Sequence, residues 1–401
     1  MHALHTRSHS TRDIRRDNRS LVLTLLRRHT LMSRVELARQ AGLTEAAISR
    51  ITRELVDAGL IEEKPVFPDG RRGRPMVNLA LAGNGLYALG VDIGANSQSL
   101  CLTNLTGETI IREDLDLLSF KTADAALKYC CKKALKMVQS AKVPPQRLVG
   151  VGVGIGIPGA ADHLNRNLLQ SPTLGWENLP VADIFEAALS VPARVEGRPR
   201  AILFAEHTSG VAQQKDNVLL IHLGLGIGVA VMIDGHVLRG SRNSAGQIGH
   251  LHVDPAGVEC VCGQRGCLDT MASGYAIVSN LGMTVAHAPA DTARIENVRL
   301  LKHAEKMAHA QDPATITIFR SAGQSLGKAL TQLAPVFDPQ LVILAGGLTQ
   351  IPGYIEGVRD TLALPPHISW ECSTMTLEHA AVCLALDTFV FGPRLDLARF
   401  A

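Results

Sequence analysis

GQIGHLHVDPAGVECVCGQRGCLD, residues 246–269, is the most informative stretch of this 401-residue chain. It contains the pattern C-x-C-G-x-x-G-C, with Cys260, Cys262 and Cys267 inside eight residues and His250 ten residues before the first cysteine. Three thiolates and one imidazole form a closed tetrahedral set for a structural zinc ion. Such a set leaves no open position for a water molecule, so the pattern does not indicate a catalytic metal.

The spacing leaves the fourth ligand open, because His252 lies two residues after His250 and would share its face in a strand. Accidental clustering of free thiols is the alternative to a metal site. The remaining cysteines stand in apolar segments and are expected to be ordinary reduced thiols; they are Cys101, Cys130, Cys131, Cys372 and Cys383.

The segments around this stretch alternate apolar strands with helices. The expected strands are residues 86–108 (as a hairpin pair), 148–157, 218–233 and 341–348. The expected helices are residues 122–141, 181–189 and 314–337. Two strand-rich halves with glycines at their strand ends favour an α/β fold with a central cleft. Such glycines can admit phosphate to the backbone, but close packing explains them about as well.

The N-terminal segment predicts a helix-turn-helix. Helical periodicity runs over residues 17–28, a capping box of Ser33 and Glu36 opens a second helix, and Thr44 caps a third that ends near Ala58. One face of the third helix is apolar, and the other carries small and basic residues suited to DNA. The predicted DNA-contacting residues of this helix are Thr44, Glu45, Ala46, Ser49, Arg50 and Arg53.

A basic loop follows this pattern. Two short strands flank PDGRRGRP, residues 68–75, which reads as the wing of a winged helix. Arg71, Arg72 and Arg74 at its tip would enter a narrow A·T-rich minor groove. The alternative is a solvated basic loop before a linker.

The net charge of the chain before the end of this loop differs in sign from that of the remainder. The whole chain carries only +3, but residues 1–75 hold 15 basic and 9 acidic side chains, a net charge of +6, and the remainder carries −3. A basic head on a mildly acidic body indicates that the head meets a polyanion. We therefore expect a DNA-binding domain at residues 1–82, with a mobile arm at 1–12, and a separate body at 83–401.

Composition excludes other classes of protein. A hydrophobic fraction of 46% excludes disorder over most of the chain. No apolar run is long enough to span a membrane, and residues 1–18 lack the apolar core of a signal peptide, so we expect a cytoplasmic protein without membrane insertion.

Taken together, the winged helix, the DIGAN turn at residues 92–96, the GLGIG turn at 224–228 and the GH…CxCGxxGC stretch resemble the ROK family of repressors, open reading frames and sugar kinases. The N-terminal domain is similar to that of its repressor branch, the N-acetylglucosamine and glucose-regulon repressors. The resemblance implies an actin-like, hexokinase-type pair of lobes with a sugar cleft. It also implies that His250 is the fourth zinc ligand.

Several kinase positions of the family differ in this chain. In VEGRPRAILFAE, residues 195–206, Gly197 stands where the kinases have Asn, and Arg198 where they have the catalytic Asp. Arginine cannot accept a proton, so we expect no enzyme activity. The family's second phosphate turn, GTGIG, is GLGIG here, so Leu225 stands in place of a residue with a hydroxyl group. The resemblance implies effector contacts from Arg198, Gln247, His250 and Asp269.

The favoured hypothesis is a repressor of carbohydrate genes. It would bind a palindromic DNA operator as a homodimer or homotetramer, and its cleft would bind a sugar or sugar derivative. Arg198 would suit an anionic effector, unless it forms a structural ion pair with Glu196 or Glu206. The alternatives are an active ATP-dependent sugar kinase with a DNA-binding head, and a DNA-bound scaffold controlled by protein contact.

Overall fold

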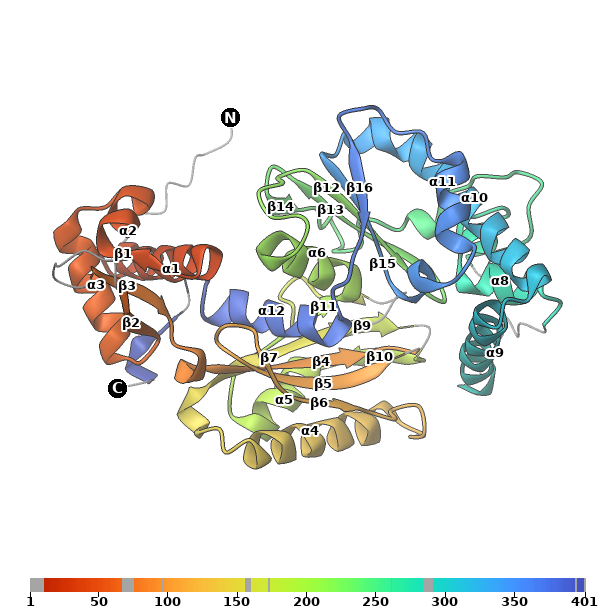
Figure 1. The fold of residues 1–401 in the computed structure, drawn as a ribbon. Helices are drawn as coiled ribbons and strands as arrows, with labels where there is room; N and C mark the ends of the chain where they lie inside the picture. The colour runs from red at the N-terminus through yellow and green to blue at the C-terminus, as the bar shows by residue number, and fades with distance from the viewer. Residues whose placement is uncertain are drawn as a thin grey trace, which may run out of the picture.

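The computed structural model describes residues 11–66, 76–95, 97–155, 160–171, 174–260, 262–283, 291–393 and 395–399. The chain forms an N-terminal head followed by a body of two lobes (Figure 1). The predicted class is confirmed: an α/β protein with a winged helix-turn-helix ahead of a two-lobed body. No helix in these ranges is long and apolar enough to cross a membrane.

The head is a winged helix-turn-helix. Its elements are α1 (Thr11–His29), β1 (Met32–Ser33), α2 (Arg34–Ala41), α3 (Glu45–Asp57), β2 (Ile61–Val66) and β3 (Met76–Leu81). Ser33 and Glu36 form the predicted capping box, and Gly42, with φ of 65°, turns the chain towards α3. The Thr44 hydroxyl accepts a hydrogen bond from the amide of Ala47, which confirms the predicted cap of α3. β2 and β3 pair antiparallel as the flanks of the wing.

Two predictions for the head fall partly outside the described residues. α1 begins at Thr11, so the last two residues of the arm predicted for residues 1–12 are helical, and residues 1–10 are not described. The wing-tip residues Arg71, Arg72 and Arg74 also lie outside the described residues.

The first lobe is built on a five-stranded sheet with the order β11-β7-β4-β5-β6. The strands are β4 (Tyr87–Ile93), β5 (Gln98–Asn104), β6 (Thr109–Asp114), β7 (Leu148–Ile155) and β11 (Ala193–Gly197). The helices are α4 (Ala123–Ser140) and α5 (Val181–Leu189). A small sheet adds β8 (Ala160–Ala161), β9 (Leu168–Ser171) and β10 (Trp176–Leu179). β4 pairs antiparallel with β5, and β5 pairs antiparallel with β6. β7 pairs parallel with β4, and β11 pairs parallel with β7.

The second lobe repeats this plan with the order β14-β13-β12-β15-β16. The strands are β12 (Val218–Leu223), β13 (Ile227–Ile233), β14 (His236–Val237), β15 (Leu341–Ala345) and β16 (Ser369–Cys372). The helices are α7 (Asp269–Ala272), α8 (Gly274–Asn280), α9 (Asp291–His309), α10 (Pro313–Phe337) and α11 (Tyr354–Thr361). Again three antiparallel strands are followed by two parallel ones. The two lobes are therefore topological duplicates.

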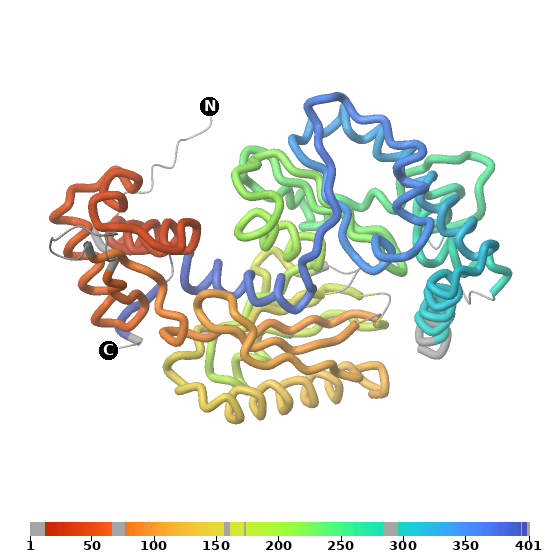
Figure 2. The backbone as a smooth tube through the Cα atoms, viewed as in Figure 1, coloured from red at the N-terminus to blue at the C-terminus, as the bar shows by residue number. Residues whose placement is uncertain are grey.

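Two helices connect the parts of the molecule: α6 (Arg198–Ser209), which follows β11, and α12 (Leu377–Phe389), which packs on β4, β7 and α6 (Figure 2). Glycines let α12 approach the first sheet closely. A Cβ atom at Gly152 would lie 1.8 Å from the carbonyl oxygen of Ala381, and one at Gly90 would lie 2.3 Å from that of Glu378. Close packing, and not phosphate binding, explains these two glycines.

The head and the first lobe share one hydrophobic core. A single cluster of buried side chains contains Leu26 and Leu79 of the head, Val149 of the first lobe, Leu386 of α12 and Phe391 beyond it. The predicted boundary after residue 82 falls between β3 and a short 3-10 turn. Because apolar contacts cross that boundary, the head is anchored to the body.

Candidate functional site

The outer face of α3 is the candidate DNA interface. Ile48, Ile51 and Leu55 are buried against the other head helices, as their helical spacing predicts. The opposite face is solvent-exposed at each predicted contact residue of this helix, namely Thr44, Glu45, Ala46, Ser49, Arg50 and Arg53. The small side chains of Ala46 and Ser49 permit close approach to a DNA groove.

Several arginines of the basic head serve internal contacts. Arg15 and Arg19 of α1 both donate to the carboxylate of Glu54 on α3, and Arg34 pairs with Glu63 across 2.6 Å. Arg50 and Arg53 form no ion pair with another described residue. The net charge of the head therefore overstates the number of arginines free for DNA, and the two on α3 remain available.

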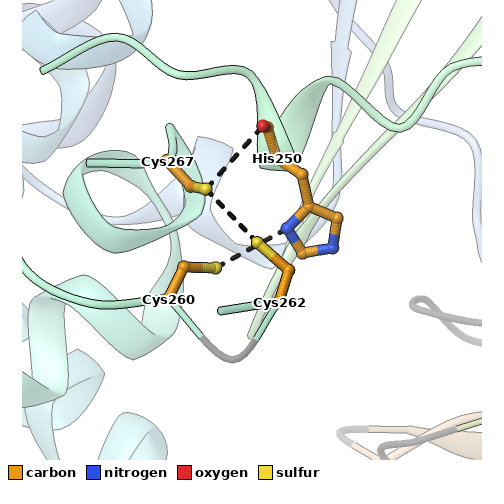
Figure 3. Close-up of side chains that lie close together, drawn as sticks. All are labelled: His250, Cys260, Cys262 and Cys267. Carbon is orange, nitrogen blue, oxygen red and sulfur yellow. Dashed lines mark hydrogen bonds between the residues drawn. The ribbon is translucent and has the colours of Figure 1, made fainter. Parts of the chain in front are cut away.

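The Cys/His stretch forms a compact group of four side chains (Figure 3). One ligand atom from each of His250, Cys260, Cys262 and Cys267 lies within 4.8 Å of the others. His250 Nδ1 is 3.6 Å from the Cys260 sulfur, and the sulfurs of Cys262 and Cys267 are also 3.6 Å apart. Tetrahedral zinc with sulfur at about 2.3 Å needs ligand atoms about 3.5–3.8 Å apart. The group can therefore hold a metal ion, and its donor set fits zinc.

The local fold excludes His252 from this group. His252 is exposed and forms an isolated bridge with Cys267 through its backbone, while His250 lies in a short 3-10 turn beside the sulfurs. Gly266 has φ of 65°, and a Cβ atom there would lie 1.6 Å from the carbonyl oxygen of Asp254. Glycine is thus required where the loop folds back towards His250.

A cavity lies between the two lobes. From the first lobe it is lined by Gln170 and Gly197, and from the start of α6 by Pro199 and Arg200. From the second it is lined by Gly226, Ile227, Gly228, Val229, Asn243, Ser244, Ala245, Gly246, Gln247, Gly249, His250 and Asp269. Three of the four predicted effector residues, Gln247, His250 and Asp269, are therefore together at this cavity. The Asp269 carboxylate accepts the amide of Ile227 at 2.8 Å, and burial raises its pKa to about 6.

A buried polar cluster forms part of the cavity wall, and sequence reasoning missed it. Arg200 donates to the side-chain oxygen of Asn243 at 2.6 Å, and Arg239 donates to buried Glu196 at 2.8 Å. Asn243 in turn donates to the carbonyl oxygen of Ala161 at 2.8 Å, which joins the second lobe to the small sheet of the first. Arg200 stands two residues after Arg198 in the sequence, but neither its burial nor its partner Asn243 is indicated by the residues around it.

Arg198 itself does not line this cavity. Its guanidinium is buried and donates to both carboxylate oxygens of Asp92, at 2.7 and 2.6 Å. A structural ion pair is thus the better description of Arg198, but the acidic partner is Asp92 rather than Glu196 or Glu206. The reason is topological, because β4, β7 and β11 are parallel neighbours and their carboxyl ends meet. Direct contact between Arg198 and an effector in the cavity has no support in this arrangement.

The second glycine turn is closed by internal contacts. The amide of Gly224 donates to the carbonyl oxygen of Gly226 at 3.1 Å, and Leu225 is buried in the core of the second lobe. Just before the turn, both ring nitrogens of buried His222 lack a hydrogen-bond partner among the described residues. Burial, assisted by the charge of Arg198, lowers the pKa of His222 to about 3.

A second cavity, of about 560 Å³, lies at the junction of the head and the first lobe. Its walls include Gly59 and Glu62 of the head together with Tyr87, Glu108 and Arg147 of the body. It is larger than the interlobe cavity, which measures about 90 Å³, but none of the predicted site residues lines it. The interlobe cavity therefore remains the candidate ligand site.

Comparisons with known proteins agree with both parts of the molecule. The xylose repressor of Bacillus spizizenii is 26% identical over 96% of this chain and 98% of its own length. The DNA-binding transcriptional dual regulator NagC of Escherichia coli K12 is 25% identical over 83% of this chain and 81% of its own. A ROK family transcriptional regulator, homologous to the MLC protein of E. coli, shares a TM-score of 0.73 and 27% identity over 94% of this chain and 98% of that one.

The body alone also resembles a kinase fold. A ROK family glucokinase from Streptomyces griseus, solved with glucose and AMPPNP, gives a TM-score of 0.62 at 24% identity over 76% of this chain and all of its own. Residues 17–72 match the MarR family, which agrees with the winged helix of the head. Residues 88–365, which include most of both lobes and the Cys/His group, match the ROK family, and the chain belongs to that family.

Proposed function

We propose that this protein is a transcriptional repressor of carbohydrate uptake or catabolism genes, with a sugar or sugar derivative as its effector. The observation that carries the proposal is the exposed face of α3, which presents Ala46, Ser49, Arg50 and Arg53 from a winged helix anchored to a ROK body. Two relatives are named xylose repressor and N-acetylglucosamine repressor. One such helix reads only a short half-site, so we expect a homodimer or homotetramer on a palindromic operator.

Arg50→Ala tests the DNA interface. We expect it to change base preference, at a cost of about 1–3 kcal/mol for the operator that the wild-type protein selects from random DNA. Lys132→Ala, at an exposed position of α4, is the matched control, because it removes the same charge far from the head. If Arg50→Ala weakened binding equally for all sequences, Arg50 would be a phosphate contact and not a base reader.

The interlobe cavity is the proposed effector site, with Gln247, His250 and Asp269 as contact residues. Since the Arg198 guanidinium is held by Asp92, the arginine that could supply an anionic preference is Arg200, which lines the cavity and lies 3.5 Å from Glu196. Calorimetric titration with neutral sugars, sugar acids and sugar phosphates separates these cases. Binding of neutral sugars alone would assign the cavity to uncharged effectors.

We further propose that the body does not phosphorylate sugars. Arg198 occupies the position of the family's catalytic Asp and cannot accept a proton, and Leu225 replaces the hydroxyl of the phosphate turn. An ATP-coupled assay over a panel of hexoses should give no turnover. Turnover at ordinary enzymatic rates, about 1 s⁻¹ or more, would overthrow this assignment.

We propose that zinc is the resident metal and that His250, Cys260, Cys262 and Cys267 hold it. Bound zinc would crosslink the loop after β14 and fix the backbone on which Gln247 and His250 line the cavity. Its role is structural, because four protein ligands leave no coordination position for substrate.

A further inference from the structure

Asp387 near the C-terminal end of α12 joins three separate elements. Its Oδ1 accepts a hydrogen bond from Arg27 of α1 in the head. Its Oδ2 lies 2.9 Å from the Thr208 hydroxyl of α6, which shares its single proton between Asp387 and the carbonyl oxygen of Phe204 at 2.6 Å. The guanidinium of Arg27 also lies 4.3 Å from the ring centroid of Phe391. The Arg27–Asp387 pair is mostly shielded, with side chains 15% and 23% exposed, so solvent screens it less than a surface pair.

α6 connects this junction to the interlobe cavity. Its first turn supplies Pro199 and Arg200 to the cavity wall, and Thr208 is at its other end. Twelve residues span about 18 Å as a single helix. Ala201 and Ala205 pack against Ala380 and Cys383 of α12 in one buried cluster, so α6 has little freedom to bend. A shift of its first turn must therefore move Thr208.

We infer that α6 holds the position of the DNA-binding head through the Thr208–Asp387–Arg27 contacts, and that Asp387 is the positioning residue of this connection. A ligand that shifts Arg200 from its contact with Asn243 would move Thr208 relative to Asp387 and loosen α1. This connection deepens the proposed function, because it names how the cavity acts on the head. Its response to a sugar rests on that proposed function.

Arg147 provides a contrasting anchor. It donates to the carbonyl oxygens of Ala58, at 2.7 Å, and Gly85, at 3.1 Å, and so ties the head to the body through contacts other than the Asp387 junction. Loss of this anchor should loosen the head while it leaves the connection to the cavity in place.

Hydrogen exchange of the full-length protein tests the connection without any ligand. Asp387→Asn should speed exchange of the α1 amides about tenfold, because a charged hydrogen-bond acceptor is lost. Thr208→Val is the decisive variant, because among the described residues no hydrogen bond joins Thr208 to α1. Exchange in α1 should rise nonetheless. Thr388→Val removes a neighbouring hydroxyl that, among the described residues, donates only within α12, to Leu384, and should change nothing. Wild-type exchange of α1 in Thr208→Val would overturn the inference.

Operator binding tests the regulatory part. With DNA selected by the wild-type protein, and with xylose, glucose and N-acetylglucosamine as probes, Thr208→Val should bind DNA but lose any sugar-dependent change in affinity. Arg147→Met should bind DNA more weakly and keep the same fold-change. Loss of the response in both variants, or in neither, would refute a connection through α6. If no sugar affects the wild-type protein, the effector proposal fails, and the exchange experiment still decides the role of Asp387.

Discussion

At the residue scale, Arg198 and Asp92 form a buried ion pair that we expect to stabilise the body. Both side chains are buried, and each carboxylate oxygen of Asp92 accepts one N–H of the guanidinium. Arg198→Met should lower the free energy of unfolding by about 3–5 kcal/mol, because it leaves Asp92 buried without its counter-charge. The double variant with Asp92→Asn should lose less than Arg198→Met alone. Urea denaturation measures both, and a single variant as stable as the wild-type protein would rule out this role.

The same pair marks the limit of sequence reasoning about the site. Gln247, His250 and Asp269, which lie within one short motif, were indicated by the resemblance to the ROK family. Asp92 is 106 positions away from Arg198, and nothing local to either residue indicates that the strand ends meet. The buried cluster of Arg200 and Asn243 was missed for the same reason.

The metal group also makes a prediction at this scale. Cys262→Ser should abolish stoichiometric zinc and lower Tm by about 5 °C or more, since metal binding contributes to folding free energy. Cys372→Ser, outside the group, is the control and should retain zinc. Zinc content by atomic spectroscopy together with a thermal scan decides the matter. A Cys262→Ser protein with normal Tm and normal DNA binding would count against a structural metal.

At the scale of elements, the glycine-rich strand β7 is explained by its contact with α12. Gly152→Ala should destabilise the protein by about 1–3 kcal/mol or more, because its methyl group would overlap the backbone of α12. Gly154→Ala in the same strand is the matched control: there the closest atom is 3.8 Å away, an ordinary contact. Equal unfolding free energies for the two variants would show that α12 does not need this close approach.

The sequence predicted β7 itself correctly, since a continuous apolar run of this length is typical of a strand that is buried on both faces. It could not choose between phosphate binding and close packing for the glycines. That choice depends on α12, which begins more than 200 residues later. Local capping signals in the head were sufficient by contrast, because Ser33, Glu36, Gly42 and Thr44 act within a few residues of one another.

At the scale of the whole molecule, the basic head and the two-lobed body form one connected structure. The charge asymmetry and the motifs predicted the two parts and their order. They did not predict the shared core, in which Leu26 of the head meets Leu386 of α12. This anchoring makes the orientation of the head depend on the body, which is what a ligand-controlled repressor requires.

The central claim is that the interlobe cavity and the DNA-binding head are thermodynamically coupled. The most direct test is the affinity of the full-length, zinc-loaded protein for its selected operator, measured with and without each sugar, sugar acid and sugar phosphate of a panel. We predict that at least one of them changes operator affinity by about 5–150-fold, the usual range for allosteric coupling. Unchanged affinity with every compound, in a protein that binds its operator tightly, would contradict the claim.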